Sequence, residues 1–173
     1  YEMFMGPLEA TKPWSMQGVE GVHRFLQRAW RMVIDTATGN LLDCVKEIEA
    51  DESTLRILHQ TIKKVTEDIE NYAFNTAISQ MMIFVNHMTG RDIRPKDVIE
   101  QFVLILSPFA PHIAEELWQR LGKSSTLTYE SWPTFDAELV KEKEIELAVQ
   151  VLGKIKDKIT VAAGATEQHI QEM

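Results

Sequence analysis

Residues 104–118 have the sequence LILSPFAPHIAEELW, in which an apolar helix end runs into two prolines. Pro111 stands where a second helix begins, and a proline in the first turn of a helix loses no backbone hydrogen bond. The stretch therefore predicts a rigid corner between two packed helices, over about residues 95–106 and 111–121. Gly122 follows as the terminator of the second helix.

Upstream of this corner, apolar residues recur at three- and four-residue spacing, the pattern of helices that bury one face. The pattern predicts helices over about residues 18–38, 52–71 and 74–89. Gly39 and Asn40 are expected to close the first helix, and a change of apolar face near residues 71–73 predicts a kink or a short break. Together with the corner, these segments predict an up-and-down bundle of about five helices.

The pattern changes after Gly122. Residues 124–133 read as a polar linker in which Trp132 docks on the bundle, and residues 144–161 alternate apolar and polar as strands do. A glycine-containing turn at residues 152–154 predicts a β-hairpin. The predicted fold class is thus mainly α, with a helical domain over residues 1–135. Residues 136–173 are predicted to be the truncated start of a small α/β domain in a piece of a longer protein.

Composition narrows the function classes. The chain has 173 residues, of which 45% are hydrophobic and 25% charged, as in ordinary globular domains. Its formal net charge of −8 is unusual for a free-standing nucleic-acid binder, although a local basic surface is compatible with it. The single cysteine, Cys44, excludes a disulfide framework and a thiolate zinc site and fits a reducing cytoplasm. No apolar run is long enough to cross a membrane.

Three arginines, Arg24, Arg28 and Arg31, recur at helical spacing opposite the apolar stripe of the first predicted helix. Such a ridge can follow the phosphates of a nucleic acid. It can equally be a solvated helix face supported by Asp35 at i+4 from Arg31. The spacing alone leaves both interpretations open.

No catalytic or metal site is predicted. His112 has Glu115 and Glu116 at helical spacing but no second histidine, so we expect it to cap or pack the helix rather than bind a metal. Residues 121–124 resemble the end of a phosphate-binding loop, but Leu117 stands where that loop requires glycine. The residues alone therefore indicate a helical bundle with a basic ridge.

Five segments together resemble the leucyl-tRNA synthetases of bacterial type, and they span nearly the whole chain. They are residues 6–14 (GPLEATKPW), 18–31 (GVEGVHRFLQRAWR), 65–70 with 74–78 (VTEDIE and FNTAI), 108–118 (PFAPHIAEELW) and 148–155 (AVQVLGKI). The corner is shared with the valyl and isoleucyl enzymes, so the leucyl resemblance depends on the first two segments and the hairpin.

The resemblance implies the tRNA-binding portion of an enzyme that activates leucine with ATP and Mg²⁺ and transfers it to tRNA(Leu). This portion would contain no catalytic residue, no cofactor and no metal. Its expected partners are tRNA(Leu) and the catalytic domain of the same chain, in a cytoplasmic enzyme that acts as a monomer. The same domain of a valyl or isoleucyl enzyme, or a stand-alone helical protein-interaction module, are the alternatives.

The resemblance also assigns roles to individual residues. The tRNA-binding residues that it implies are Arg24, Arg28, Arg31, Lys154, Lys156 and Lys158. Lys12 and Trp14 are expected to pack against the catalytic domain instead.

Overall fold

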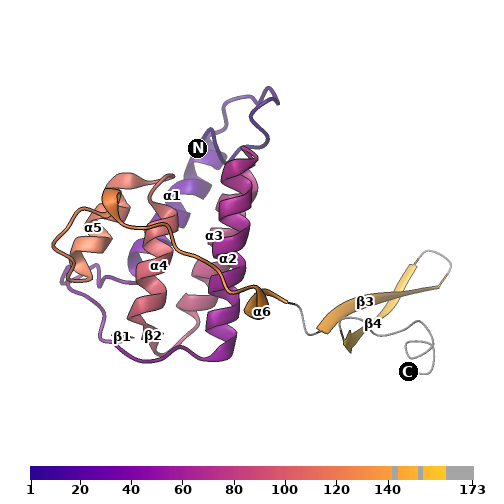
Figure 1. Cartoon of the computed structure of the whole chain (residues 1–173). Coiled ribbons are helices and arrows are strands. Elements are labelled where there is room, and N and C mark those ends of the chain that lie inside the picture. Colours follow the sequence, from indigo (N-terminus) through magenta and orange to yellow (C-terminus); the bar gives the residue numbers. More distant parts are fainter. Residues whose placement is uncertain (142–143, 152–153, 163–173) are drawn as a thin grey trace. The chain divides into compact units, whose positions relative to one another are not determined.

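A computed structural model describes residues 1–141, 144–151 and 154–162, with side-chain surroundings for residues 1–141. The chain divides into two compact units, residues 1–139 and 140–173, and each is described by itself (Figure 1). The first unit is helical and the second contains a β-hairpin.

The first unit is the predicted helical bundle. Its helices are α1 (Met16–Arg31), α2 (Glu52–Glu70), α3 (Phe74–Thr89), α4 (Lys96–Leu106) and α5 (Pro111–Arg120). Shorter elements are a 3₁₀ turn, η1 (Leu127–Tyr129), and α6 (Ala137–Val140). The sequence did not predict a short parallel pair between β1 (Val45–Lys46) and β2 (Arg94–Pro95), which joins the connections that precede α2 and α4.

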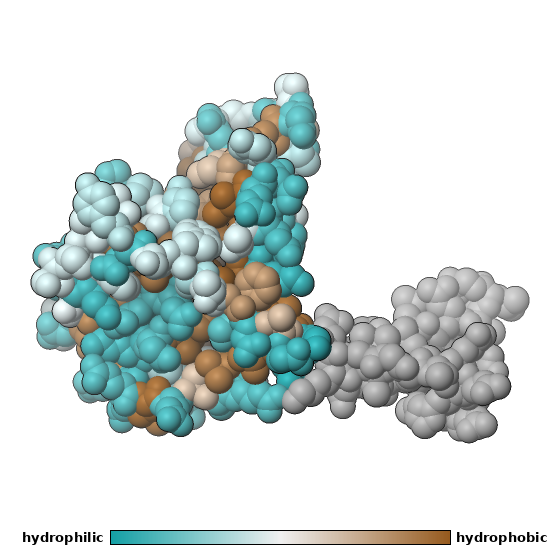
Figure 2. Space-filling view, viewed as in Figure 1, coloured by the Kyte–Doolittle hydropathy of each residue, from teal (hydrophilic) through white to brown (hydrophobic). Residues whose placement is uncertain are grey.

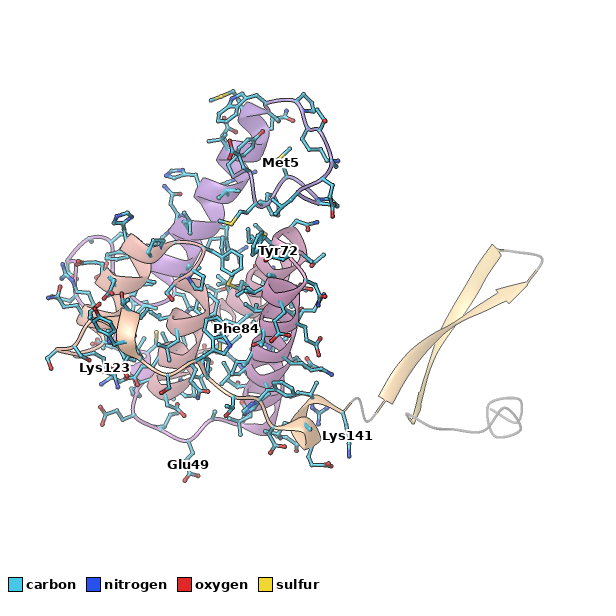
Figure 3. The ribbon with its side chains drawn as sticks, turned by 45° about the horizontal axis from the view of Figure 1, so that its top comes forward. Met5, Glu49, Tyr72, Phe84, Lys123 and Lys141 are labelled. Carbon is cyan, nitrogen blue, oxygen red and sulfur yellow. The ribbon has the colours of Figure 1, made fainter. Side chains whose placement is uncertain are left out.

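The core lies between these helices, and the predicted apolar seams form it. Leu58, Ile62 and Val65 of α2 are fully buried. Phe84 of α3 lies inside the bundle and stacks on Phe102 of α4, with ring centroids 4.6 Å apart (Figure 3). Burial of such large apolar side chains is the main source of the bundle's stability.

The predicted corner and break are both present. At the corner, the Phe109 and Ala110 amides donate to the carbonyl of Leu106, and α5 begins at Pro111. At the break, Tyr72 takes φ of 56°, a conformation that ends a helix. The buried carboxylate of Asp68 then accepts from Thr76 Oγ1 at 2.6 Å, which ties the end of α2 to the start of α3.

The first helix is shorter than predicted, because α1 ends at Arg31 and not near residue 38. Ile34 pairs with Leu41 in an antiparallel bridge, and Asp35 accepts from the Ala37 amide at 2.9 Å and from Thr38 Oγ1 at 3.0 Å. These side-chain bonds favour a tight turn over further helix. Gly39, with φ of 73°, completes this turn and does not close the helix.

Arg94 joins the ends of two helices. Its guanidinium donates to the carbonyl of Met32, which caps α1, at 2.7 Å. It also donates to the carbonyls of Met88 and Thr89 in the last turn of α3, at 3.0 and 3.3 Å. Terminal helix carbonyls lack partners within their own helix and carry the negative end of the helix dipole, so one cation satisfies both ends.

The segment after η1 docks on α2, as expected for Trp132. Its indole Nε1 donates to Thr66 Oγ1 at 2.9 Å, and the amide of Asp136 donates to His59 Nδ1 at 3.1 Å. Figure 2 shows hydrophobic surface where this segment crosses the helices, bordered by hydrophilic surface. Phe135 and Trp132 are both only partly covered there.

The second unit contains the predicted hairpin. Strands β3 (Glu144–Val151) and β4 (Lys154–Ala162) pair antiparallel, from Glu144 opposite Ala162 to Val151 opposite Lys154. The register shifts between Val149 and Gln150, as at a β-bulge. Residues 152–153, on which the predicted turn falls, lie outside the described residues.

We predict that Arg94→Met lowers the free energy of unfolding by about 2–4 kcal/mol, because three helix-terminal carbonyls lose a charged donor. Chemical denaturation of the 173-residue chain measures this change. Arg31→Met is the matched control, since exposed Arg31 bonds only to Gln27 among the residues whose side chains the structure describes. A loss of stability no larger for Arg94→Met than for the control would show that Arg94 does not hold the helix ends.

We predict that the bond between Asp136 and His59 weakens as the pH falls below about 6.5. Burial lowers the pKa of His59 from its ordinary 6.5, and the neighbouring carboxylate of Asp136 only partly opposes this. Neutral His59 therefore stabilises the fold above pH 6.5, and this stabilisation is lost as the pH falls through the lowered pKa. Protonated Nδ1 cannot accept the amide hydrogen.

Hydrogen exchange of the Asp136 amide measures this bond, with protection factors corrected for the intrinsic pH dependence of exchange. Protection should fall between pH 7.5 and 5.5. In His59→Asn, whose side-chain oxygen accepts without titrating, protection should stay constant. Equal pH dependence in both proteins would contradict the prediction.

Candidate nucleic-acid interface

The candidate interface is the outer face of α1. Arg24, Arg28 and Arg31 are exposed on it, while Phe25 and Ala29 of the same helix are buried. The helix begins at the cap Ser15, whose hydroxyl accepts from the Gly18 amide at 3.3 Å. We call Arg24, Arg28 and Arg31 the arginine ridge.

Arg24 and Arg28 lie over a groove between α1 and α3 of about 310 Å³, whose floor includes Phe25, Met82 and Val85. Arg28 Nη2 lies 3.5 Å from Thr89 Oγ1, at the limit of a hydrogen bond. Arg24 makes no hydrogen bond or ion pair with any residue that the structure describes. Both guanidinium groups therefore keep most of their donors for a ligand, and phosphate oxygens suit them.

Arg31 has a different setting. Its Nε donates to the carbonyl of Gln27 at 3.2 Å, and its Nη2 donates to Gln27 Oε1 at 3.3 Å. The suggested support from Asp35 is wrong, because Asp35 lies in the turn after α1 and accepts from Ala37 and Thr38. These bonds lower the pKa of Asp35, so its carboxylate serves the turn.

A second groove, the α1–α5 groove, opens on the other side of the ridge with a volume of about 500 Å³. Its lining residues come from α1, the following turn and α5: His23, Leu26, Gln27, Trp30, Arg31, Thr36 and Ile113. Sequence reasoning placed Trp30 in the buried stripe, but the side chain is only half-buried. The polar residues His23, Gln27 and Arg31, spaced four apart beside Trp30, are the feature of the sequence that could have indicated this groove.

The other predicted site residues are spread over the chain. Lys12 and Trp14 are exposed on the arm before α1, and the Trp14 ring lies 4.6 Å from that of Tyr1. Lys154, Lys156 and Lys158 belong to β4, and their side chains lie outside the part described. Of the predicted site residues whose side chains are described, the structure brings together the three arginines of the ridge.

The expected capping or packing role of His112 is wrong, since its side chain is exposed and forms no cap of α5. Glu115 instead accepts from Thr126 Oγ1 at 2.5 Å and from the Leu127 amide at 3.1 Å. These bonds lower the pKa of Glu115 and hold η1 against α5. Lys123 pairs with Glu100 at 2.7 Å, and no group of three metal-ligating side chains occurs among the described residues.

The geometry offers cationic donors and grooves, and comparison with known proteins gives the family. A family model described as the anticodon-binding domain of tRNA ligase matches residues 51–171, well over half of the chain. The chain belongs to this family. The helical-bundle fold predicted from the sequence agrees with this membership.

Relatives of this anticodon-binding domain confirm the resemblance to leucyl-tRNA synthetases. The leucine–tRNA ligase of Rhodopirellula baltica is 49% identical over 174 residues, which cover 99% of this chain and 18% of that protein. Leucine–tRNA ligase 1 of Rhizobium johnstonii is 52% identical over 167 residues, which cover 96% of this chain and 20% of that protein. The chain thus spans about a fifth of the length of these relatives.

A solved structure is also similar. It is the ternary complex of a leucyl-tRNA synthetase of Agrobacterium radiobacter with tRNA and LeuAMS, and the match has a TM-score of 0.69 at 30% identity. The match covers 98% of this chain and 23% of that one. Within the described part of this anticodon-binding domain, no helix combines the length and apolarity needed to cross a lipid bilayer.

Proposed function

We propose that this chain is the tRNA-docking portion of a bacterial-type leucyl-tRNA synthetase. It holds the body of tRNA(Leu) so that the acceptor end reaches the catalytic domain of the same enzyme, which attaches leucine with ATP. The observation that carries the proposal is the arginine ridge, three exposed guanidinium groups on α1 of a domain that is half identical to leucine–tRNA ligases.

The ridge suits backbone recognition. Its side chains stand on one rigid helix, and Arg24 and Arg28 are near enough in sequence to contact neighbouring phosphates of one strand. Guanidinium contacts to phosphates position an RNA without reading its bases. A local cluster of this kind attracts RNA even on a chain of net charge −8, because electrostatic attraction at the contact distance depends on nearby charges.

The remaining assignments complete the proposal. We assign Lys154, Lys156 and Lys158 to further phosphate contacts from a small C-terminal domain over residues 136–173. Lys12 and Trp14 pack against the catalytic domain, and the exposed Trp14 ring supports this role. We assign ATP and Mg²⁺ to that catalytic domain, as the resemblance to leucyl-tRNA synthetases implies. The intact enzyme is a cytoplasmic monomer in this proposal.

The alternatives have less support. A valyl or isoleucyl enzyme would share the corner at residues 108–118, but the relatives that match nearly the whole chain are leucine–tRNA ligases. A stand-alone protein-interaction module would leave the match of residues 51–171 to the anticodon-binding domain of tRNA ligase unexplained.

We predict that Arg24→Ala combined with Arg28→Ala weakens binding of a tRNA(Leu) transcript by about tenfold or more in low salt. Each phosphate contact releases counterions from the RNA. Losing a contact should therefore make the slope of log K against log salt shallower by about one. Fluorescence anisotropy over a series of salt concentrations measures both quantities.

The control is Lys46→Ala combined with Lys63→Ala, which removes the same charge from exposed or half-exposed positions on β1 and α2. The control should leave affinity and salt slope nearly unchanged. If the control weakens binding as much as the arginine pair does, net charge and not the ridge governs binding. If neither pair weakens binding, the ridge does not contact the tRNA, and in both cases the proposed docking surface is wrong.

A further inference from the structure

The α1–α5 groove has a chemical character that the arginine ridge lacks. Its floor is apolar, with Leu26 and Trp30 from α1 and Ile113 from α5. Its volume of about 500 Å³ lies within the range of sites that hold small molecules. Backbone recognition by arginines does not need such a groove.

A polar ladder forms one wall of this groove. His23 Nε2 and Gln27 Nε2 lie 3.4 Å apart, and Arg31 donates to both the side chain and the carbonyl of Gln27. The three side chains follow one another at i, i+4 and i+8 along α1, so each holds the next in place. A wall of fixed donors and acceptors is preorganised to read the edge of a planar ligand.

Trp30 supplies the surface on which such a ligand would lie. Its side chain is half-buried, so it is held in place while part of the ring remains accessible. Its indole N–H makes no hydrogen bond with any residue of the described part of the chain. An aromatic ring beside polar side chains is the arrangement that binds unstacked bases of single-stranded RNA.

The ridge and the groove share one helix. Arg31 belongs to both, and Gln27 lies one turn from Arg24 and next to Arg28 in the sequence. A strand whose phosphates contact Arg24 and Arg28 therefore passes the mouth of the groove. The local positive charge favours RNA over a neutral or basic protein surface as the source of the ligand, and the aromatic ring beside it favours a base over an acidic side chain.

We propose that the α1–α5 groove receives one unstacked base of the tRNA, which stacks on Trp30 while Gln27 and His23 bond to its edge. This inference rests on the proposed function, because the ridge must first place the tRNA on α1. It adds base capture to a surface that otherwise contacts only phosphates.

The test compares Trp30→Leu and Gln27→Ala with the arginine double variant and with Trp14→Leu, which removes an exposed indole elsewhere. Anisotropy with a tRNA(Leu) transcript is measured over the salt series. Trp30→Leu should weaken binding by about fivefold or more, the effect of losing one stacked base. The salt slope should stay unchanged, since stacking releases no counterions. Gln27→Ala should weaken binding by a smaller factor in the same manner.

Thermal denaturation shows whether Trp30→Leu stays folded. If it does not, Gln27→Ala still tests the groove, because Gln27 is exposed and its loss leaves the core intact. A photoreactive benzoylphenylalanine at position 30 gives a direct readout. It should cross-link to one unpaired nucleotide, located by the stop it causes in reverse transcription.

The outcomes separate the two proposals. If the arginine double variant binds like the unchanged chain, the proposed function fails, and base capture fails with it. If the arginine pair weakens binding while Trp30→Leu and Gln27→Ala do not, only base capture is overturned. A cross-link to a protein segment in place of RNA would also overturn base capture and identify the groove as a protein-docking site.

Discussion

The guanidinium of Arg94 donates to helix-end carbonyls that lie about 60 residues apart in the sequence. One is at Met32, where α1 ends, and the others are at Met88 and Thr89, where α3 ends. The backbone of Arg94 pairs with the connection before α2 at the same time, through its amide and the Cys44 carbonyl at 2.7 Å. Arg94 therefore bonds to three segments at once: the end of α1, the end of α3 and the connection before α2.

The candidate interface depends on this junction. Because Arg94 binds the carbonyl that follows α1, the helix ends at a fixed point beside the last turn of α3. Arg28 lies one turn earlier and reaches Thr89, whose carbonyl Arg94 also binds. The exposed arginines of the ridge thus stand on a helix whose end is held by the partly buried Arg94. Because the helix is already ordered, binding of phosphates by these arginines carries no further entropy cost for ordering the backbone.

Much of the bundle could be predicted because its signals are local. The prolines at 108 and 111 and the seam of α2 specify a corner and a buried face without distant partners. The end of α1 was placed too late, because Asp35 bonds to Ala37 and Thr38 in a turn where the helix was expected to continue. The donor to the last carbonyl, Arg94, lies 62 residues beyond Met32 and gives no local signal. The spacing of Arg24, Arg28 and Arg31 predicted the ridge, but the spacing of the apolar residues on the same helix placed Trp30 in the core. Only the positions of the turn after α1 and of Ile113 show that a groove opens beside that ring.

The segment that contains Trp132 and Asp136 leaves only a short tether between the bundle and the hairpin. Trp132 and Asp136 bind Thr66 and His59 of α2, so the chain is held to the bundle as far as residue 136. Only residues 137–143 then separate this anchored point from β3. A short tether raises the effective concentration of one binding module for a ligand already held by the other. Under the proposed function, phosphate contacts from Lys154, Lys156 and Lys158 of β4 would add to the affinity of the ridge through this tether.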